Sequence, residues 1–319
     1  MGSSPATVTS SVPGKLMVAG EYSVLTPGGH AIAFAVYPGL TVTLSPGEED
    51  TLTSHALGVD NVPLKPEGVT SFAHYALRYC RRAFPLPNSW SITVEGGLHI
   101  HGEKVGLGGS ASVVSGIVHC WSQLVESDSG VEWAQVAMDA HYEASGNRGS
   151  GYDVATTTHG GVVLYAPKSA DRDAPMIRTL PWPKGLVWMA GFCGKGVSTR
   201  ALLDRTRPSE RSPLVSMRQG VDRLISAWEG GEVRSVLSNV AQLDSLFEAW
   251  SQEEGLLLMT ESMAKMRALA HEEGGVCRVS GAGGGDSLLV FSDDAAVLKR
   301  IEDRWQAHGF PTLQLTLEA

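Results

Sequence analysis

A glycine-rich segment directly before an apolar helical stripe is the feature that most constrains this chain. The segment is Gly106–Ser112 (GLGGSAS), and the apolar residues after it recur at helical spacing as far as Val125. Glycines let backbone N–H groups approach a ligand closely, and the first turn of a helix adds donors without a partner inside the helix. The segment therefore predicts a phosphate-binding loop at a helix N-terminus. A tight turn closed by a serine N-cap is the alternative that this segment alone leaves open.

Two other nucleotide-binding signatures fit this segment less well. Residues 106–111 match the dinucleotide pattern G-x-G-x-x-A, and Glu126 and Asp128 lie near the place of its ribose-binding acid. However, the polar stretch HIHGEK replaces the strand that should precede the glycines. The Walker A pattern is absent, because no Lys-Ser or Lys-Thr pair follows. An NAD-dependent oxidoreductase stays an alternative that the missing strand disfavours.

Glycine is abundant in the whole chain, 37 of 319 residues, and it gathers in further clusters. The run Ser280–Gly285 (SGAGGG) lies between two predicted strands and is longer than a hairpin turn requires. Because consecutive glycines cost backbone entropy on folding, we expect something to approach this backbone closely. A long flexible loop is the alternative.

Two charged residues stand in the remaining glycine clusters. Asp153 ends the segment Gly146–Asp153 and is predicted to act as a general base or to orient a substrate hydroxyl, with a helix N-cap as the alternative. Lys15 follows Pro13 and Gly14 and could contact phosphate. Its alternative is an ordinary solvated lysine.

Charge and composition exclude several classes of protein. The net charge of −9 argues against a general nucleic-acid binder. No apolar run is long enough for a transmembrane helix, so no membrane partner is expected. The four cysteines lie far apart without a CxxC pair, which predicts reduced thiols in a cytoplasmic protein. We interpret His30, His141 and His159 as packing or turn residues, because their spacing predicts no metal site.

Strands and helices are mixed along the chain without strict alternation, which favours an α+β fold in two domains. Four prolines between 167 and 183 mark the expected junction, giving domains of residues 1–184 and 185–319. Strands are predicted at 15–20, 30–37, 40–45, 91–96, 160–166, 185–193, 276–281, 287–291 and 313–319. Helices are predicted at 69–84, 113–125 and 131–145, and 213–273 should be mostly helical.

Three segments in order, PGKLMVAGEYSVL, VGLGGSAS and SGAGGGD, resemble the motifs of the GHMP small-molecule kinases, and the resemblance runs from residue 13 to 291. It implies an N-terminal mixed α/β sheet domain with the ATP-binding motif. It also implies a C-terminal ferredoxin-like α+β domain with the substrate loop and the third motif. The segments GEYSVLTPGG and GSGYDVA most resemble the phosphomevalonate kinase branch of the family.

The resemblance implies ATP-dependent phosphorylation of 5-phosphomevalonate to 5-diphosphomevalonate in the mevalonate pathway of isoprenoid biosynthesis, with ATP and Mg²⁺. The acceptor would be a small acid, and the protein a monomer or homodimer. A mevalonate kinase or another GHMP kinase is the alternative. A non-catalytic nucleotide-binding relative is a further one, because Gly109 stands where the family has the first of two serines.

The resemblance also implies the site residues. ATP would lie over Gly106, Leu107, Gly108, Gly109, Ser110, Ala111 and Ser112, and Ser110 would contact Mg²⁺. Catalysis would use Asp153, Lys15 and Lys104. The substrate would contact Lys15, Glu21, Tyr22, Ser150, Gly151, Tyr152, Ser198, Thr199, Arg200, Gly281, Ala282 and Gly283. Glu143 is a second candidate for Mg²⁺, one place from the position of a glutamate in mevalonate kinases.

Overall fold

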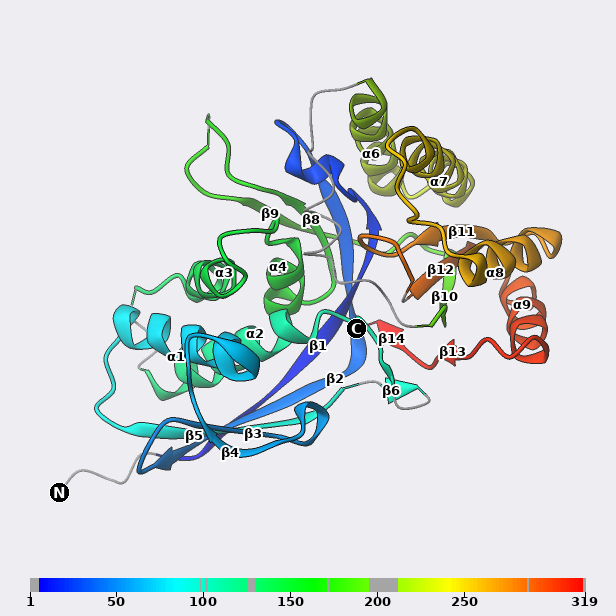
Figure 1. Cartoon of the computed structure of the whole chain (residues 1–319). Helices are drawn as coiled ribbons and strands as arrows, with labels where there is room; N and C mark the ends of the chain where they lie inside the picture. The colour runs from blue at the N-terminus through cyan, green and yellow to red at the C-terminus, as the bar shows by residue number, and fades with distance from the viewer. Residues whose placement is uncertain are drawn as a thin grey trace.

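Two β-sheets, each packed against helices, form the frame of the molecule (Figure 1). The structure is a computed structural model that describes residues 6–97, 99–100, 103–125, 130–170, 172–194, 212–285 and 287–317. In spatial order the first sheet contains β4 (Val59–Pro63), β3 (Thr51–Ser54), β5 (Ser89–Gly96), β2 (Ala31–Gly47), β8 (Val162–Ala166) and β9 (Met176–Leu180). Strands β1 (Val8–Ala19) and β14 (Thr316–Leu317) also pair with β2.

The second sheet is smaller and antiparallel. Its spatial order is β11 (Val276–Val279), β12 (Ser287–Ser292), β10 (Val187–Phe192) and β13 (Thr312–Leu313). A separate short pair, β6 (His99–Ile100) and β7 (Glu103–Lys104), precedes the main glycine loop.

The helices divide between the two sheets. One face of the first sheet is covered by α1 (Ser71–Ala83), α2 (Gly109–Leu124), α3 (Trp133–Ala144) and α4 (Tyr152–His159). The other half of the chain contributes α6 (Ser212–Gly230), α7 (Val233–Glu253), α8 (Glu261–Glu272) and α9 (Ala295–Ala307). Short 3-10 turns are η1 (Ser23–Leu25), η2 (His55–Leu57) and η3 (Gly68–Thr70). This mixed arrangement confirms the predicted α+β fold class.

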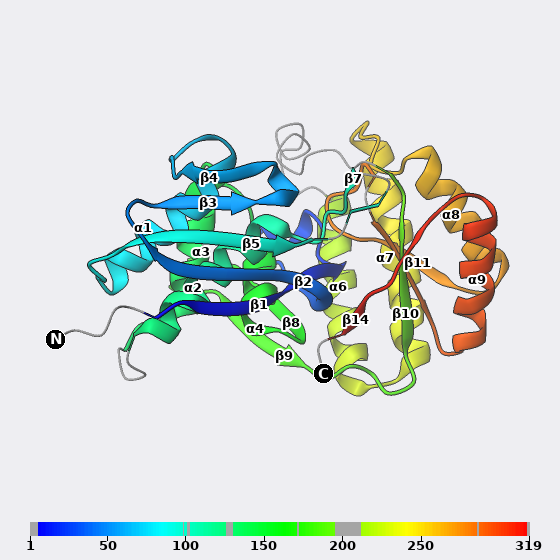
Figure 2. The same cartoon turned by 90° about the horizontal axis from the view of Figure 1, so that it is seen from below.

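The first six residues of β2, 31–36, are buried on both faces of the sheet, which explains why each of them is apolar. Ala31 packs into the core below α1–α4, whereas Ile32 and Phe34 pack into a second core shared with α6 and α7. Successive side chains of a strand point to opposite faces, so a strand covered on both sides is apolar at every position. Figure 2 shows β1 and β2 extending from the α1–α4 half toward the half with α6–α9.

The structure differs from the predicted strands at Pro38-Gly39. The sequence predicted two strands, 30–37 and 40–45, but one strand, β2, runs through both. Its partner β1 accommodates the interruption by a register shift between Val12, which pairs with Leu40, and Gly14, which pairs with Val36. Helices α4 and α9 and strands β3 and β4 were not among the predicted elements.

The end of the chain also differs from the prediction of one strand at 313–319. It divides into β13, which joins the second sheet at β10, and β14, which joins the first sheet at β2. The domain boundary at residues 184 and 185 stays a prediction. All four cysteines are buried and free. No helix within the described ranges is long and apolar enough to cross a membrane.

Gly116 on α2 packs closely against β1 and β2, which yields a testable prediction. A Cβ at this position would lie 2.4 Å from Cγ2 of Val42 and 3.0 Å from Cγ2 of Val12. Gly116→Ala should therefore lower the free energy of unfolding by about 1–3 kcal/mol through overpacking. This loss opposes the gain of roughly 1 kcal/mol that alanine gives in a helix.

Urea unfolding of both variants would measure these effects. The matched control is Gly230→Ala in the last turn of α6, where a Cβ would meet nothing within 4 Å. The control should be neutral or stabilising. Equal stabilisation by both substitutions would contradict the close contact between α2 and β2.

Candidate active site

The main glycine loop is held directly by strand β1. The backbone N–H of Lys15 donates to the carbonyl of Leu107 at 2.8 Å. The hydroxyl of Ser112 donates to the carbonyl of Pro13, also at 2.8 Å. The first and second predicted motifs thus form one unit, although about 90 residues separate them.

Lys15 brings a buried positive charge to this loop. Its side chain is only 8% exposed and packs against Gly108, where a Cβ would lie 2.9 Å from Cγ of the lysine. The ammonium Nζ lies 5.6 Å from the ring centroid of Tyr152. Burial raises the pKa of Tyr152, and the charge of Lys15 partly opposes that rise. A lysine charge beside a helix N-terminus favours binding of an anion.

Helices α2 and α4 begin in the same way. Their N-cap residues are Gly108 and Gly151, with φ of 80° and 91°, a left-handed conformation that favours glycine. Neither helix has a side-chain hydrogen bond at its N-cap. Ser110 and Asp153 each occupy the second position of their helix, so each presents a polar oxygen beside N–H groups of the first turn.

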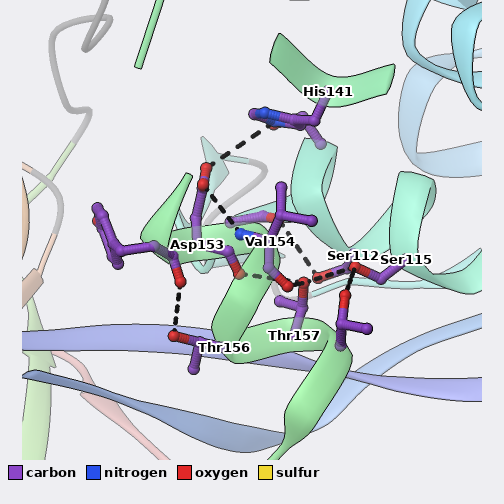
Figure 3. Close-up of polar contacts among 11 residues, drawn as sticks. Ser112, Ser115, His141, Asp153, Val154, Thr156 and Thr157 are labelled. Atoms are coloured by element: carbon purple, nitrogen blue, oxygen red, sulfur yellow. Dashed lines mark hydrogen bonds and ion pairs between the residues drawn. The ribbon is translucent and has the colours of Figure 1, made fainter. Parts of the chain in front are cut away.

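His141 on α3 contacts both helix ends, and Figure 3 shows its ring pointing toward Asp153. Its Nε2 lies 3.2 Å from the hydroxyl of Ser110 and 3.9 Å from Oδ2 of Asp153. The other oxygen of Asp153 accepts a hydrogen bond from the backbone of Val154 at 2.9 Å. The interpretation of His141 as a packing residue is therefore incomplete, because its ring also contacts two predicted site residues.

The other predicted residue on α3, Glu143, has different partners. Its carboxylate accepts hydrogen bonds from Arg78 at 3.0 Å and from the hydroxyl of Tyr79 at 2.6 Å. It follows His141 by two positions, which places it on another side of the helix. Lys104 lies in β7, and Ser198, Thr199 and Arg200 lie outside the described residues.

Glu21 and Tyr22 contact the third glycine cluster and its strand. Both are buried, with exposed fractions of 2% and 4%. The hydroxyl of Tyr22 donates to the carbonyl of Ala282 at 2.7 Å, and Glu21 accepts a hydrogen bond from Arg278 on β11. The backbone N–H of Met17 donates to the Ser280 hydroxyl at 2.9 Å, so β1 holds this cluster as well.

The rest of this glycine cluster also packs closely. The backbone N–H of Gly284 donates to the carbonyl of Leu258 at 2.7 Å, and a Cβ at Gly283 would lie 2.9 Å from Cβ of Leu258. Gly281, by contrast, has nothing within 4 Å of a built Cβ.

Ser150, another predicted substrate residue, lies next to the N-cap of α4. Its carbonyl accepts a hydrogen bond from the hydroxyl of Tyr165.

Arg278 is the centre of a buried charge cluster. Its guanidinium also donates to the carbonyl of Leu243 at 3.0 Å and lies 4.0 Å from Oδ1 of Asp244. One arginine is thus shared by two buried carboxylates, and Oε1 of Glu21 has no hydrogen-bond partner among the described residues. Burial raises the pKa of Glu21 to about 7, although Arg278 opposes the shift.

A mainly apolar pocket, open to solvent, lies beside the glycine loop. Its lining includes Leu40, Leu57, Val94, Leu107, Gly109 and Val113. A second cavity shares Gly109 and Val113 with it and reaches Ser110. An apolar cavity next to convergent polar groups is the usual form of a small-molecule site.

Two models of one family match the chain. The model for the GHMP kinases N terminal domain matches residues 71–161, and the model for the GHMP kinases C terminal matches residues 237–310. Together they cover more than half of the sequence. The chain belongs to the GHMP kinase family. It is an enzyme of this type, and the predicted resemblance is confirmed.

Relatives of this GHMP kinase point to one branch of the family. A phosphomevalonate kinase of Streptomyces sp. (strain CL190) is 29% identical, with 97% of each chain covered. A phosphomevalonate kinase of Saccharolobus solfataricus is 26% identical, with 94% of each covered. The fold matches Streptococcus pneumoniae phosphomevalonate kinase in complex with phosphomevalonate and AMPPNP, at a TM-score of 0.83 and 22% identity. That match covers 98% of this chain and 100% of the other.

The raised pKa of Glu21 predicts a pH-dependent stability. Because its folded pKa of about 7 lies above the ordinary value of 4.5, folding favours the protonated carboxyl. This contribution is present below the ordinary value and is lost as pH rises toward the folded pKa. Glu21→Gln should therefore lose less stability than the parent as pH rises from about 5 to 7. Urea unfolding at several pH values measures this.

Glu248→Gln is a control of opposite sign. The hydrogen bond from Arg267 lowers the pKa of Glu248, so its contribution is lost as pH falls. The control should change the acid side of the curve and leave the pH 5–7 window as in the parent. A Glu21→Gln curve parallel to the parent throughout would contradict the raised pKa.

Proposed function

We propose that this GHMP kinase transfers the γ-phosphoryl group of ATP to 5-phosphomevalonate and forms 5-diphosphomevalonate. The observation that carries the proposal is the convergence of Lys15, Ser110 and Asp153 at two helix N-termini without side-chain caps. Such a site suits polyphosphate, because N–H groups and a lysine charge meet at one place. We choose phosphomevalonate as the acceptor because relatives of this chain are phosphomevalonate kinases.

In this proposal the glycine loop binds the phosphates of ATP and the adjacent cavity binds its nucleoside. We place the ATP phosphates over residues 106–112, where the start of α2 offers its N–H groups. The apolar cavity beside Gly109 would take the nucleoside, since its walls are mainly aliphatic. Gly109 lines that cavity, so the missing serine at this position leaves space beside the loop.

The residues at the two helix ends also fit Mg²⁺. This ion prefers oxygen ligands, keeps several waters and is usually bound through one or two carboxylates together with substrate phosphates. Asp153 and Ser110 supply such oxygens around a common neighbour, His141. No cluster of three or more acidic, histidine or cysteine side chains in the described part could bind a metal without phosphate. When bound, Mg²⁺ would neutralise phosphate charge; Ser110 and Asp153 would hold it.

Transfer to a phosphate acceptor needs alignment more than proton removal. The acceptor oxygen is already ionised near neutral pH, so Asp153 would act by orienting its neighbours rather than as a strong base. Lys15 would place positive charge at the transferred group. We propose that Lys104 also places positive charge at the transferred group. Ser150, Gly151 and Tyr152 lie at the N-terminus of α4, where we expect them to contact the substrate.

The remaining predicted substrate contacts come from the second half of the chain and from η1. We propose that Ser198, Thr199 and Arg200 hold the acid groups of the acceptor, because arginine binds phosphate and carboxylate through two parallel hydrogen bonds. Glu21 and Tyr22 would act indirectly. They hold the cluster Gly281–Gly283 in place through Arg278 and the carbonyl of Ala282.

An ADP-release assay with separate acceptors tests the proposal. Phosphomevalonate should give the highest kcat/KM, and mevalonate, homoserine and galactose should give little turnover. Preferred turnover of mevalonate would replace the proposed acceptor but keep the kinase. ATP binding without turnover of any acceptor would favour a non-catalytic relative.

Asp153→Asn gives a prediction for the site itself. The amide keeps the shape but loses the charge, so the turnover number should fall at least about tenfold while thermal unfolding stays the same. Asp139→Asn on α3 is the matched control, because that carboxylate contacts Gln135 of its own helix. Parent-like turnover by the Asp153 variant would refute its assigned role.

A further inference from the structure

We infer that His141 is a positioning residue of the phosphoryl-transfer site, which orients Ser110 and Asp153 toward the metal and phosphates. The inference rests on the proposed function. None of the predicted roles uses this histidine, although its ring lies beside Ser110 of α2 and Asp153 of α4. Figure 3 shows the ring pointing toward Asp153.

The ring of His141 is held in place independently of the site. It packs against Phe72 on α1, with ring centroids 5.1 Å apart and planes inclined at 33°. Its side chain is 12% exposed, half as much as that of Asp153 at 24%. Helix α3 thus presents Nε2 to α2 and α4 from a fixed point. A ring fixed by packing can restrict the side chains that it contacts.

Both contacts use the same nitrogen. Nε2 can accept a hydrogen bond from the Ser110 hydroxyl, or it can carry a proton and donate a hydrogen bond to the Ser110 oxygen. At 3.9 Å from Oδ2 of Asp153, it makes a longer polar contact with that carboxylate. In either case the Ser110 oxygen is restrained toward the ring, and its remaining lone-pair direction is restrained with it. Asp153 is restrained on its Oδ1 side by the backbone of Val154 and lies near Nε2 on its Oδ2 side.

In this proposal Ser110 and Asp153 hold Mg²⁺ without a glutamate from α3. Glu143 is bound to Arg78 and Tyr79, so α3 directs a nitrogen rather than a carboxylate to the site. An imidazole ring, unlike a carboxylate, adds no negative charge beside the phosphates. It acts on Mg²⁺ through its neighbours, and partners of this kind typically change metal affinity or activity by 10–100-fold when removed.

The test compares two substitutions of His141 in the full chain. His141→Phe keeps the packing on Phe72 and removes the nitrogen, whereas His141→Gln keeps a polar nitrogen near the position of Nε2. AMPPNP binding is measured by calorimetry at a series of Mg²⁺ concentrations. The readout is the Mg²⁺ concentration at which AMPPNP binding reaches half of its maximum. His141→Phe should raise this concentration about tenfold, and His141→Gln should restore most of the loss. Thermal unfolding of both should match the parent.

A double-mutant cycle with Ser110→Ala separates positioning from a structural effect. If His141 acts through Ser110, adding His141→Phe to Ser110→Ala should change the Mg²⁺ requirement much less than it does in the parent. His119→Phe on α2 is the matched control, because that ring contacts Ser10 instead, and it should leave the Mg²⁺ titration unchanged.

Each result decides the inference. Additive effects in the cycle, or a Mg²⁺ titration of His141→Phe identical to the parent, would overturn it. Turnover of an acceptor other than phosphomevalonate would overturn the proposed reaction alone, because AMPPNP binding does not depend on the acceptor. A parent that binds no AMPPNP would overturn both.

Discussion

Hydrogen bonds to strand β1 hold the glycine segments of both halves of the chain. Within five residues β1 holds the main glycine loop through Pro13 and Lys15 and the third glycine cluster through Met17. The same strand carries the buried lysine between those contacts. A strand is stiff over so short a distance, so the loops are placed relative to Lys15 by backbone geometry rather than by flexible side chains.

The buried charges of Glu21, Arg278 and Asp244 complete this frame on the far side of β1. Removing Arg278 would leave Glu21 buried without its cationic partner, which costs several kcal/mol, whereas Asp244 would keep its ion pair with Arg267. The junction between the two sheets therefore does not depend on apolar packing alone. It also depends on Arg278 meeting Glu21 across two segments about 260 residues apart.

The sequence predicted the parts of the site that depend on local chemistry. A glycine run before an apolar stripe has few other uses, so the start of α2 was predictable, and so was the polar residue in each glycine cluster. The contact of His141 with Ser110 and Asp153 depends on how three helices pack, and no spacing pattern records it. Glu21 and Tyr22 belong to a motif that the resemblance identified. Their contacts, of Tyr22 with the carbonyl of Ala282 and of Glu21 with Arg278, follow from the fold and could not be read from the sequence. Helix α4 was missed because its threonine-rich sequence has low helix propensity, and packing on α2 and β8 overrides that propensity.

The position of β14 has a consequence for how the protein folds during synthesis. The first sheet begins with β1, made near the start of translation, and receives β14 only after residue 317 has been added. Until then the strand β2 lacks one partner beside Val36 and Tyr37. The apolar face that meets α6 and α7 is uncovered for a shorter period, until residues 212–253 have been made. The first sheet therefore has an exposed apolar face while the residues up to the end of α7 are synthesised, and chains with such exposed surface are prone to aggregate.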